Sequence, residues 1–249
     1  MQRRIKLLIA YDGTDYIGWQ ENGMGPSIEG TLQRALVKVL RESPELVAAS
    51  RTDAGVHASG QVVAFGTSSP IPIDKLLFAV NTCLPKAIRL LSAEEVDPDF
   101  HPTLGNRGKL YSYAITLGPM QLPRKRLYAW HLPGHFACDP VREAMPALLG
   151  SHDFATFCNE KRSAAQRGTI CTLRRLELTQ NGHELTFEVE GDRFLYRMVR
   201  NLVGTLVAIG RGRAKAHDLR GVLERCDRRL AGPCAPAHGL TLSRVFFDP

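Results

Sequence analysis

The first apolar stretch of the chain reads RIKLLIAYDGT, from Arg4 to Thr14, and the fold can be worked out from it. Its β-compatible residues end at Asp12-Gly13-Thr14, which predicts a buried strand that runs into a turn. Pro26 and Ser27 then offer a helix start. The apolar residues of 28–40 recur at spacings of three and four, which predicts an amphipathic helix after the strand.

The second half of the chain repeats this order. Arg107-Gly108-Lys109-Leu110-Tyr111 echoes residues 4–8, and a helix is expected at 139–149. We therefore expect an α+β fold with two related lobes, residues 1–104 and 105–249, each with mainly antiparallel strands flanked by helices. The other expected strands are 45–50, 61–65, 87–96, 171–179, 184–190 and 240–247, and the other expected helices are 74–82 and 194–209.

The charge of the chain favours a polyanionic partner. Its 249 residues include 32 Lys and Arg against 25 Asp and Glu, which gives a net charge of +7. From Phe100 to Cys138 there is no acidic residue, and this stretch contains a basic group, Arg124, Lys125 and Arg126. Arg193, Arg197 and Arg200 recur at spacings of four and three, which predicts that they align along one helix flank, either to bind the partner or as a solvated face.

The spacing of cysteine, histidine and glycine residues argues against disulfide bonds, a metal site and a nucleotide cofactor. The six cysteines are scattered without a C-x-x-C pair, so we expect reduced thiols in a cytoplasmic protein. Cys226, Cys234 and His238 lack a fourth ligand, so we expect no metal. Gly105 to Lys109 is too short for a phosphate-binding loop, and Gly210-Arg211-Gly212 lacks a third glycine, so no nucleotide cofactor is expected. No stretch is apolar enough to span a membrane.

The segment Ser50 to Gln61 reads SRTDAGVHASGQ and concentrates reactive side chains in an expected loop, Arg51 to Gly60, between two strands. It places a cation, a hydroxyl, a carboxylate and an imidazole within a few residues. One interpretation is structural: a turn in which Asp53 binds its own backbone and Gly55 adopts positive φ. The other is an aspartate that works with an arginine on a large anionic substrate.

Ser50 to Ala58 resembles the signature of the tRNA pseudouridine synthase A (TruA) family, usually G-R-T-D-A-G-V-H-A. Two departures are Ser50, where the family has glycine, and the stretch Glu21 to Gly25. Further matches follow in the family's order over nearly the whole chain: Tyr11-Asp12-Gly13-Thr14, Gly18-Trp19-Gln20, Phe100-His101-Pro102, Lys109-Leu110-Tyr111-Ser112-Tyr113, Met198-Val199-Arg200-Asn201 and Ala235-Pro236-Ala237-His238-Gly239-Leu240.

The resemblance implies an isomerase that converts uridine to pseudouridine in the anticodon stem-loop of tRNA, at nucleotides 38 to 40, without a cofactor. It also implies a mixed sheet, an active-site cleft between the lobes, and a homodimer in which one tRNA contacts both subunits. A uridine in a stem must be unstacked before its glycosidic bond can be reached. The net change needs one carboxylate, whether the first step is attack on the base, attack on the sugar or removal of a sugar proton.

The resemblance assigns roles to particular residues. It implies that Asp53 is the catalytic carboxylate, that Tyr111 packs on the target base, and that Arg200 pairs with Asp53 and keeps it ionised. It also implies that Arg51 helps to displace the nucleotide and that Leu240 lines the pocket. His57 is expected to order the loop or to contact RNA.

Two other functions remain open from the residues alone. The basic patches and strand aromatics would suffice for a non-catalytic RNA-binding module, although that interpretation leaves Asp53 unexplained. A metal-dependent nuclease using Asp12, Asp15 and Asp53 would need a divalent metal and would shorten its RNA.

Overall fold

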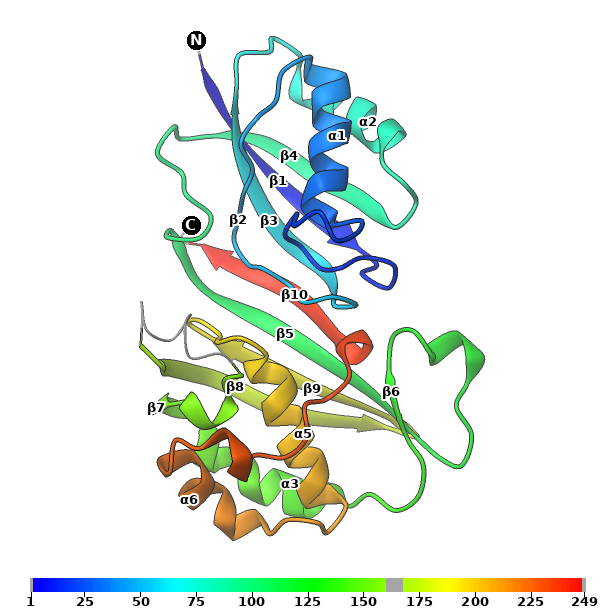
Figure 1. Cartoon of the computed structure of the whole chain (residues 1–249), viewed down its shortest axis with the longest axis vertical. Coiled ribbons are helices and arrows are strands. Elements are labelled where there is room, and N and C mark those ends of the chain that lie inside the picture. Colours follow the sequence, from blue (N-terminus) through cyan, green and yellow to red (C-terminus); the bar gives the residue numbers. More distant parts are fainter. Residues whose placement is uncertain (1, 160–167, 248–249) are drawn as a thin grey trace. The chain divides into compact units, whose positions relative to one another are not determined.

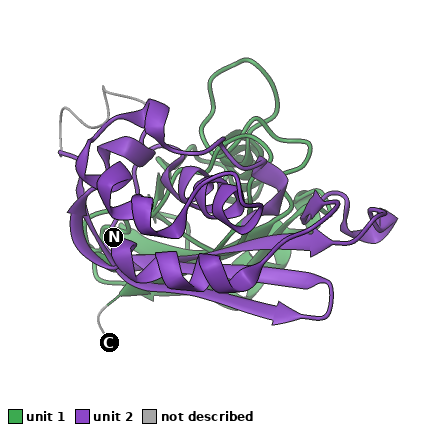
Figure 2. Ribbon diagram, turned by 90° about the horizontal axis from the view of Figure 1, so that it is seen from below, with its two compact units in different colours: residues 1–107, 241–249 green, residues 108–240 purple. Residues whose placement is uncertain are grey.

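The structure, a computed structural model, describes residues 2–159 and 168–247. The chain folds into two compact units, residues 1–107 with 241–249 and residues 108–240 (Figure 2). The expected second lobe included the last strand of the chain. In the structure this strand, β10 (Leu240–Phe247), pairs in parallel with β3 (His57–Thr67), and its residues from Thr241 onward belong to the first unit.

The sheet of unit 1 is mixed. Its strands lie in the order β4 (Ile88–Val96), β1 (Arg3–Tyr11), β3 and β10, and β2 (Val47–Ala48) also pairs with β3 (Figure 1). β1 is antiparallel to both β3 and β4, and β2 is antiparallel to β3. Alternate residues of β1 are buried, as expected for a strand with one face on the core.

Two helices cover the core of unit 1. α1 (Ile28–Leu40) begins at Ser27, whose hydroxyl accepts a hydrogen bond from the amide of Gly30 over 3.0 Å. α2 (Ile73–Cys83) contacts α1 and β4. The helices contribute buried apolar side chains at helical spacing to the same core as β1: Ile28, Leu32, Leu36 and Leu40 from α1, and Leu76 and Val80 from α2.

The strands of unit 2 are mostly antiparallel. β5 (Asn106–Leu117) pairs with β9 (Glu184–Gly191), β9 with β8 (Ile170–Asn181), and β8 with β7 (Gly150–Asp153), all antiparallel. The short strand β6 (Trp130–Leu132) pairs in parallel with β5. β6 and β7 were not predicted from the sequence, because they are too short to show a periodic pattern.

Helix α5 (Met198–Gly210) is the central helix of unit 2 and is buried on nearly every side. It contacts α3 (Cys138–Ala144), which is followed by a 3-10 turn at Met145–Leu148. A single helix was expected at 139–149, but Pro146 has no amide proton to continue an α-helix, so the helix ends before it. α6 (Leu219–Glu224) packs beside this turn.

Two further expectations differ from the structure. The loop expected at Arg51 to Gly60 ends at Val56, because β3 begins at His57 and pairs with the end of β1. The helix expected at 194–209 begins only at Met198. No helix in the described ranges is long and apolar enough to cross a membrane.

Candidate active site

Asp53 lies in a tight turn that leads into β3. The amide of Val56 donates to the carbonyl of Asp53 over 3.1 Å, which closes the turn. Gly55 has a φ of +74°, in the left-handed region that glycine adopts without a steric penalty. Asp53 also forms an isolated antiparallel bridge with Gly18. The turn interpretation and the catalytic interpretation are therefore compatible, since the turn holds the backbone of Asp53 in place.

A second segment, Tyr16–Trp19, is hydrogen-bonded to this turn through its backbone. The amide of Trp19 donates to the carbonyl of Thr52 over 3.0 Å, and the amide of Gly55 donates to the carbonyl of Tyr16 over 3.3 Å. Tyr11, at the end of β1, shares a buried hydrogen bond of 2.8 Å with the hydroxyl of Thr52. The backbone on both sides of Asp53 is thus held in place by hydrogen bonds with Tyr11 and with the Tyr16–Trp19 segment.

His57 fixes the other end of the turn. Its side chain is almost fully buried, and its Nδ1 accepts a hydrogen bond of 3.1 Å from the amide of Gly13. Nδ1 also lies 3.2 Å from Asp12 Oδ1, which accepts from both the amide and the hydroxyl of Thr14. A Cβ at Gly13 would stand 2.0 Å from the carbonyl oxygen of Val56, so the two segments touch there. Of the two roles expected for His57, this geometry supports loop ordering.

Ser50 fits the site without the glycine that the family uses. The described non-glycine residues with positive φ are Arg41, Arg197 and Cys226, so Ser50 has an ordinary backbone conformation. The buried side chain of Gln61 clamps it, because Gln61 Nε2 donates to the carbonyl of Ser50 over 2.6 Å and Oε1 accepts from its amide over 3.3 Å. The substitution therefore leaves the start of the Asp53 turn anchored.

Tyr111 belongs to unit 2 and stands on β5. Its ring meets the ring of Phe194 edge to face, with centroids 5.1 Å apart. Tyr113 lies two residues further, on the same face of the strand, and is fully buried. Its ring packs edge to face against Trp130 at 6.4 Å. The two tyrosines therefore differ in environment, although the sequence shows them as an alternating pair.

Arg200 lies in the first turn of α5. Its Nε donates to the carbonyl of Ala235 over 2.8 Å, and the amide of Ala235 donates to the carbonyl of Arg200 over 3.1 Å. The next residue, Asn201, is fully buried, and its Oδ1 accepts from Arg228 Nη2 over 2.9 Å. The start of α5 is therefore fixed by polar contacts with the segment before β10.

The prediction that three arginines align along one helix flank is wrong. Arg197 has a φ of +60° and precedes the helix, so Arg193 and Arg197 do not share a helix face with Arg200. The reason is tertiary: Asp192 Oδ1 accepts from the amide of Thr172 over 2.8 Å and from the amide of Arg193 over 2.7 Å. These bonds tie the chain after β9 to β8 and delay the start of the helix.

The expected site residues divide between the two units. Asp53, Arg51 and His57 lie together around one turn of unit 1, with Arg51 exposed. Tyr111, Arg200 and Leu240 belong to unit 2, where Leu240 is buried at the end of the segment that begins with Ala235. Tyr11, Gly13 and Trp19 stand in segments that match the family signature, which gives them no role by residue type. Their backbone and hydroxyl contacts with the Asp53 turn could not be inferred from residue type.

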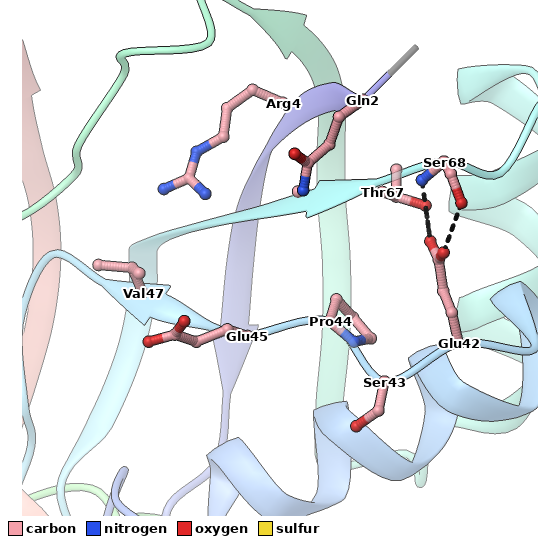
Figure 3. A pocket seen from close by; sticks show the side chains of 10 residues that line it. Gln2, Arg4, Glu42, Ser43, Pro44, Glu45, Val47, Thr67 and Ser68 are labelled. Carbon is pink, nitrogen blue, oxygen red and sulfur yellow. Dashed lines mark hydrogen bonds between the residues drawn. The ribbon is translucent and has the colours of Figure 1, made fainter.

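A cavity in unit 1 lies at the other end of β3 from the Asp53 turn (Figure 3). Its volume is about 450 Å³, and Arg4, Glu42, Glu45 and Thr67 are among its lining residues. Hydrogen bonds from Thr67 and Ser68 hold the pKa of Glu42 below its usual value. At about 3.3 Å per residue, the 11-residue β3 spans roughly 30 Å between this cavity and the Asp53 turn. The cavity is therefore separate from the candidate active site.

Within residues 2–159 and 168–247, no three His, Cys, Asp or Glu side chains are grouped so that they could hold a metal ion. The three aspartates of the nuclease alternative are thus not arranged as a ligand cluster. Asp12 instead serves as the acceptor for Thr14 in the turn after β1.

A family described as tRNA pseudouridine synthase matches residues 7–103 and 144–248 of the chain. A relative from Protochlamydia amoebophila, tRNA pseudouridine synthase A 2, is 43% identical over 98% of this chain and 94% of its own length. The tRNA pseudouridine synthase A of Brevibacillus brevis is 38% identical over 98% of this chain and 100% of its own. Both alignments include the Asp53 turn and the segments that hold it.

A solved structure described as a Cbf5-Nop10-Gar1 complex aligns with 97% of this chain and 50% of that chain, at 14% identity and a TM-score of 0.42. The sequence matches, by contrast, cover nearly all of both chains and include the motif that the structure builds into a pinned turn. On these grounds the chain belongs to the tRNA pseudouridine synthase A family of isomerases.

Proposed function

We propose that this protein isomerises uridine to pseudouridine in tRNA, with Asp53 as the catalytic carboxylate. The observation that carries the proposal is the turn around Asp53, which buried contacts from Tyr11, Gly13 and the Tyr16–Trp19 segment hold on several sides. A carboxylate that must meet one atom of a large substrate needs this kind of fixed backbone. The names of the relatives from Protochlamydia amoebophila and Brevibacillus brevis support the same substrate.

In this isomerisation the bond from the ribose C1′ to a base nitrogen breaks, and a bond from C1′ to a base carbon forms. The proton of that carbon is lost, and the freed nitrogen gains one, so atoms and charge balance without a redox partner. One ionised carboxylate can serve as nucleophile or as base in this sequence. Asp53 is the acidic residue of the pinned turn and is half-buried, which leaves its carboxylate within reach of a substrate.

Arg51 and Tyr111 are proposed to bind the displaced nucleotide. Taking a base out of a stacked stem costs a few kcal/mol, which an inserted cation and an aromatic surface can offset. The exposed side chain of Arg51, two residues before Asp53, suits the first task. The edge-to-face contact of Tyr111 with Phe194 fixes the orientation of its ring, which suits the second.

Arg200 and Leu240 are proposed to complete the site, Arg200 as the cation that keeps Asp53 ionised and Leu240 as an apolar lining residue. The main support for both roles is the family signature in which they stand. The contact of Arg200 Nε with Ala235 gives further support, because it reduces the rotational freedom of the guanidinium. A guanidinium held in this way loses less entropy when it binds a carboxylate.

We propose that the modified uridines lie in the anticodon stem-loop of tRNA, at nucleotides 38 to 40. We also propose that the active form is a homodimer in which one tRNA contacts both subunits. The net charge of +7 supports binding to a folded RNA. Light scattering on the purified protein tests the dimer, which would show twice the 27.5 kDa mass of one chain. A mass of one chain at micromolar concentration would contradict it.

The decisive experiment incubates purified protein with unmodified tRNA in the presence of a chelator, and then maps pseudouridine along the RNA. We expect intact tRNA with new pseudouridine at nucleotides 38 to 40. RNA that is shortened without chelator but stays intact with chelator would indicate a metal-dependent nuclease. Bound but unmodified RNA would indicate a binding module. Pseudouridine elsewhere in the tRNA would keep the isomerase and reject the proposed target.

A further inference from the structure

The segment Gly232–Pro236, which we call the brace, lies against α5. The amide of Gly232 donates to Thr205 Oγ1 over 2.8 Å, and the amide of Ala235 donates to the carbonyl of Arg200 over 3.1 Å. Between these bonds, a Cβ at Gly204 would stand 1.7 Å from the carbonyl oxygen of Pro233, so helix and brace touch backbone to backbone. The brace therefore follows α5 from Thr205 back to Arg200.

At its end the brace also holds the side chain of Arg200. The carbonyl of Ala235 accepts from Arg200 Nε over 2.8 Å, and Ala235 is fully buried. A guanidinium is planar, so a bond at Nε fixes the plane in which the other nitrogen atoms lie. The direction of the Arg200 guanidinium is thus tied to the position of the Ala235 carbonyl.

The brace has a second anchor on β5. The hydroxyl of Tyr113 donates to the carbonyl of Pro236 over 2.7 Å. Burial raises the pKa of Tyr113 far above its usual value, although the charge of Arg200 opposes this effect. The hydroxyl therefore stays protonated and remains a donor over the whole working pH range. Pro236 has a φ of −54°, and its ring restricts rotation next to Ala235.

We infer that Tyr113 is a positioning residue, which orients the guanidinium of Arg200 through the backbone of Pro236 and Ala235. The inference rests on the role proposed for Arg200. Because Tyr111 and Tyr113 share one face of β5, the strand that carries the proposed base-stacking ring also carries the anchor for the arginine. The hydroxyl of Tyr113 thereby ties β5 to the segment that holds the Arg200 side chain.

A purely structural role is the alternative for Tyr113, since its ring packs against Trp130 and against Gly239. Tyr113→Phe separates the two roles, because it keeps the ring and removes the hydroxyl. We expect kcat to fall about 10-fold with KM for tRNA within about twofold. We also expect the acidic limb of the activity profile to move to higher pH, as in Arg200→Ala. An unchanged kcat and pH profile, whatever the melting temperature, would overturn the inference.

Thr205→Val is the matched control, because it removes another hydrogen bond between α5 and the brace, at Gly232. We expect a lower melting temperature and a kcat within about twofold of the wild type. An equal loss of kcat in both variants would show that any weakening of the brace slows the reaction. That result would overturn the specific role of Tyr113.

A double-mutant cycle completes the test. If Tyr113 acts through Arg200, Tyr113→Phe should lower kcat no further once Arg200→Ala is present. Independent, additive losses would overturn the inference while leaving the proposed function intact. A wild-type kcat in Arg200→Ala would instead reject the role of Arg200, and absence of pseudouridine with the wild-type enzyme would reject the proposed function itself.

Discussion

The amide of Gly13 donates a 3.1 Å hydrogen bond to Nδ1 of His57, and this bond joins the turn after β1 to the first residue of β3. The turn that carries Asp53 stands directly before His57, so its far end cannot move without breaking a buried contact. His57 thus anchors the backbone at the end of the Asp53 turn.

Gly13→Ala should damage the site without touching any proposed substrate contact. The new Cβ would stand 2.0 Å from the carbonyl oxygen of Val56, so the Asp53 turn must shift. We expect kcat to fall at least about 10-fold and stability by about 1–3 kcal/mol, measured by turnover on tRNA and by urea unfolding. Gly221→Ala is the control, since a Cβ there meets nothing within 4 Å and alanine favours the helix. Equal kcat in both variants would contradict the argument.

Asp53→Asn should abolish pseudouridine formation and leave tRNA affinity within about threefold, because the change removes a charge and keeps the size of the side chain. Single-turnover assays and filter binding measure the two quantities. Asp15→Asn, at an exposed position of the same region, should keep wild-type turnover. Substantial turnover by Asp53→Asn would refute its assignment as the catalytic carboxylate.

Arg200→Ala should move the acidic limb of the activity profile to higher pH. Activity needs an ionised Asp53, and without the proposed cation a larger share of the enzyme carries the neutral acid at any given pH. Arg200→Lys keeps the charge and should shift the limb less. Arg197→Ala removes the same charge and should mainly weaken RNA binding. If the acidic limb lies at the same pH in all variants and in the wild type, Arg200 contacts a phosphate of the RNA and does not pair with Asp53.

The basic segment after β5 should contribute to the salt dependence of binding. Arg124 and Arg126 are exposed, whereas Lys125 lies 2.9 Å from Glu184 in an ion pair. Replacing Arg124, Lys125 and Arg126 with Ala should reduce the slope of log affinity against log salt by about 1–2, mainly through the two arginines. Arg220→Ala with Arg229→Ala, which removes two exposed and paired cations, is the control. An unchanged slope would place the RNA on another face.

Stability should fall above pH 9 partly because of Cys171. Burial raises the pKa of this thiol from 9.0 to about 11. Between these values the unfolded chain loses the proton while the folded chain keeps it, so the free energy of unfolding decreases as pH rises, by about 3 kcal/mol in total. Cys171→Ser cannot ionise and should lose less stability between pH 8 and 11 in urea titrations. An equal decrease in the free energy of unfolding in both proteins would show that another group, for example Tyr113, causes the loss of stability.

Periodicity in the sequence was enough for the long elements. The spacing of apolar residues predicted α1 at its observed limits, and the alternation in 184–190 predicted β9 within one residue. Local pattern failed where a distant contact decides the conformation. The chain before Met198 looks helical, but Asp192 binds the backbone of β8 and Arg197 takes a left-handed conformation, so the helix starts late.

The family, the α+β class and the candidate catalytic aspartate can be read from the amino-acid sequence, because a motif consists of residue types in a fixed order. The residues that hold the backbone of that aspartate and the side chain of Arg200 are identified by contacts between distant parts of the chain. The contacts of Gly13 with His57 and of Tyr113 with Pro236 join residues that are 44 and 123 positions apart. Their partners are chosen by strand pairing and helix packing, which bring distant backbone groups within hydrogen-bonding distance and leave no local pattern in the chain.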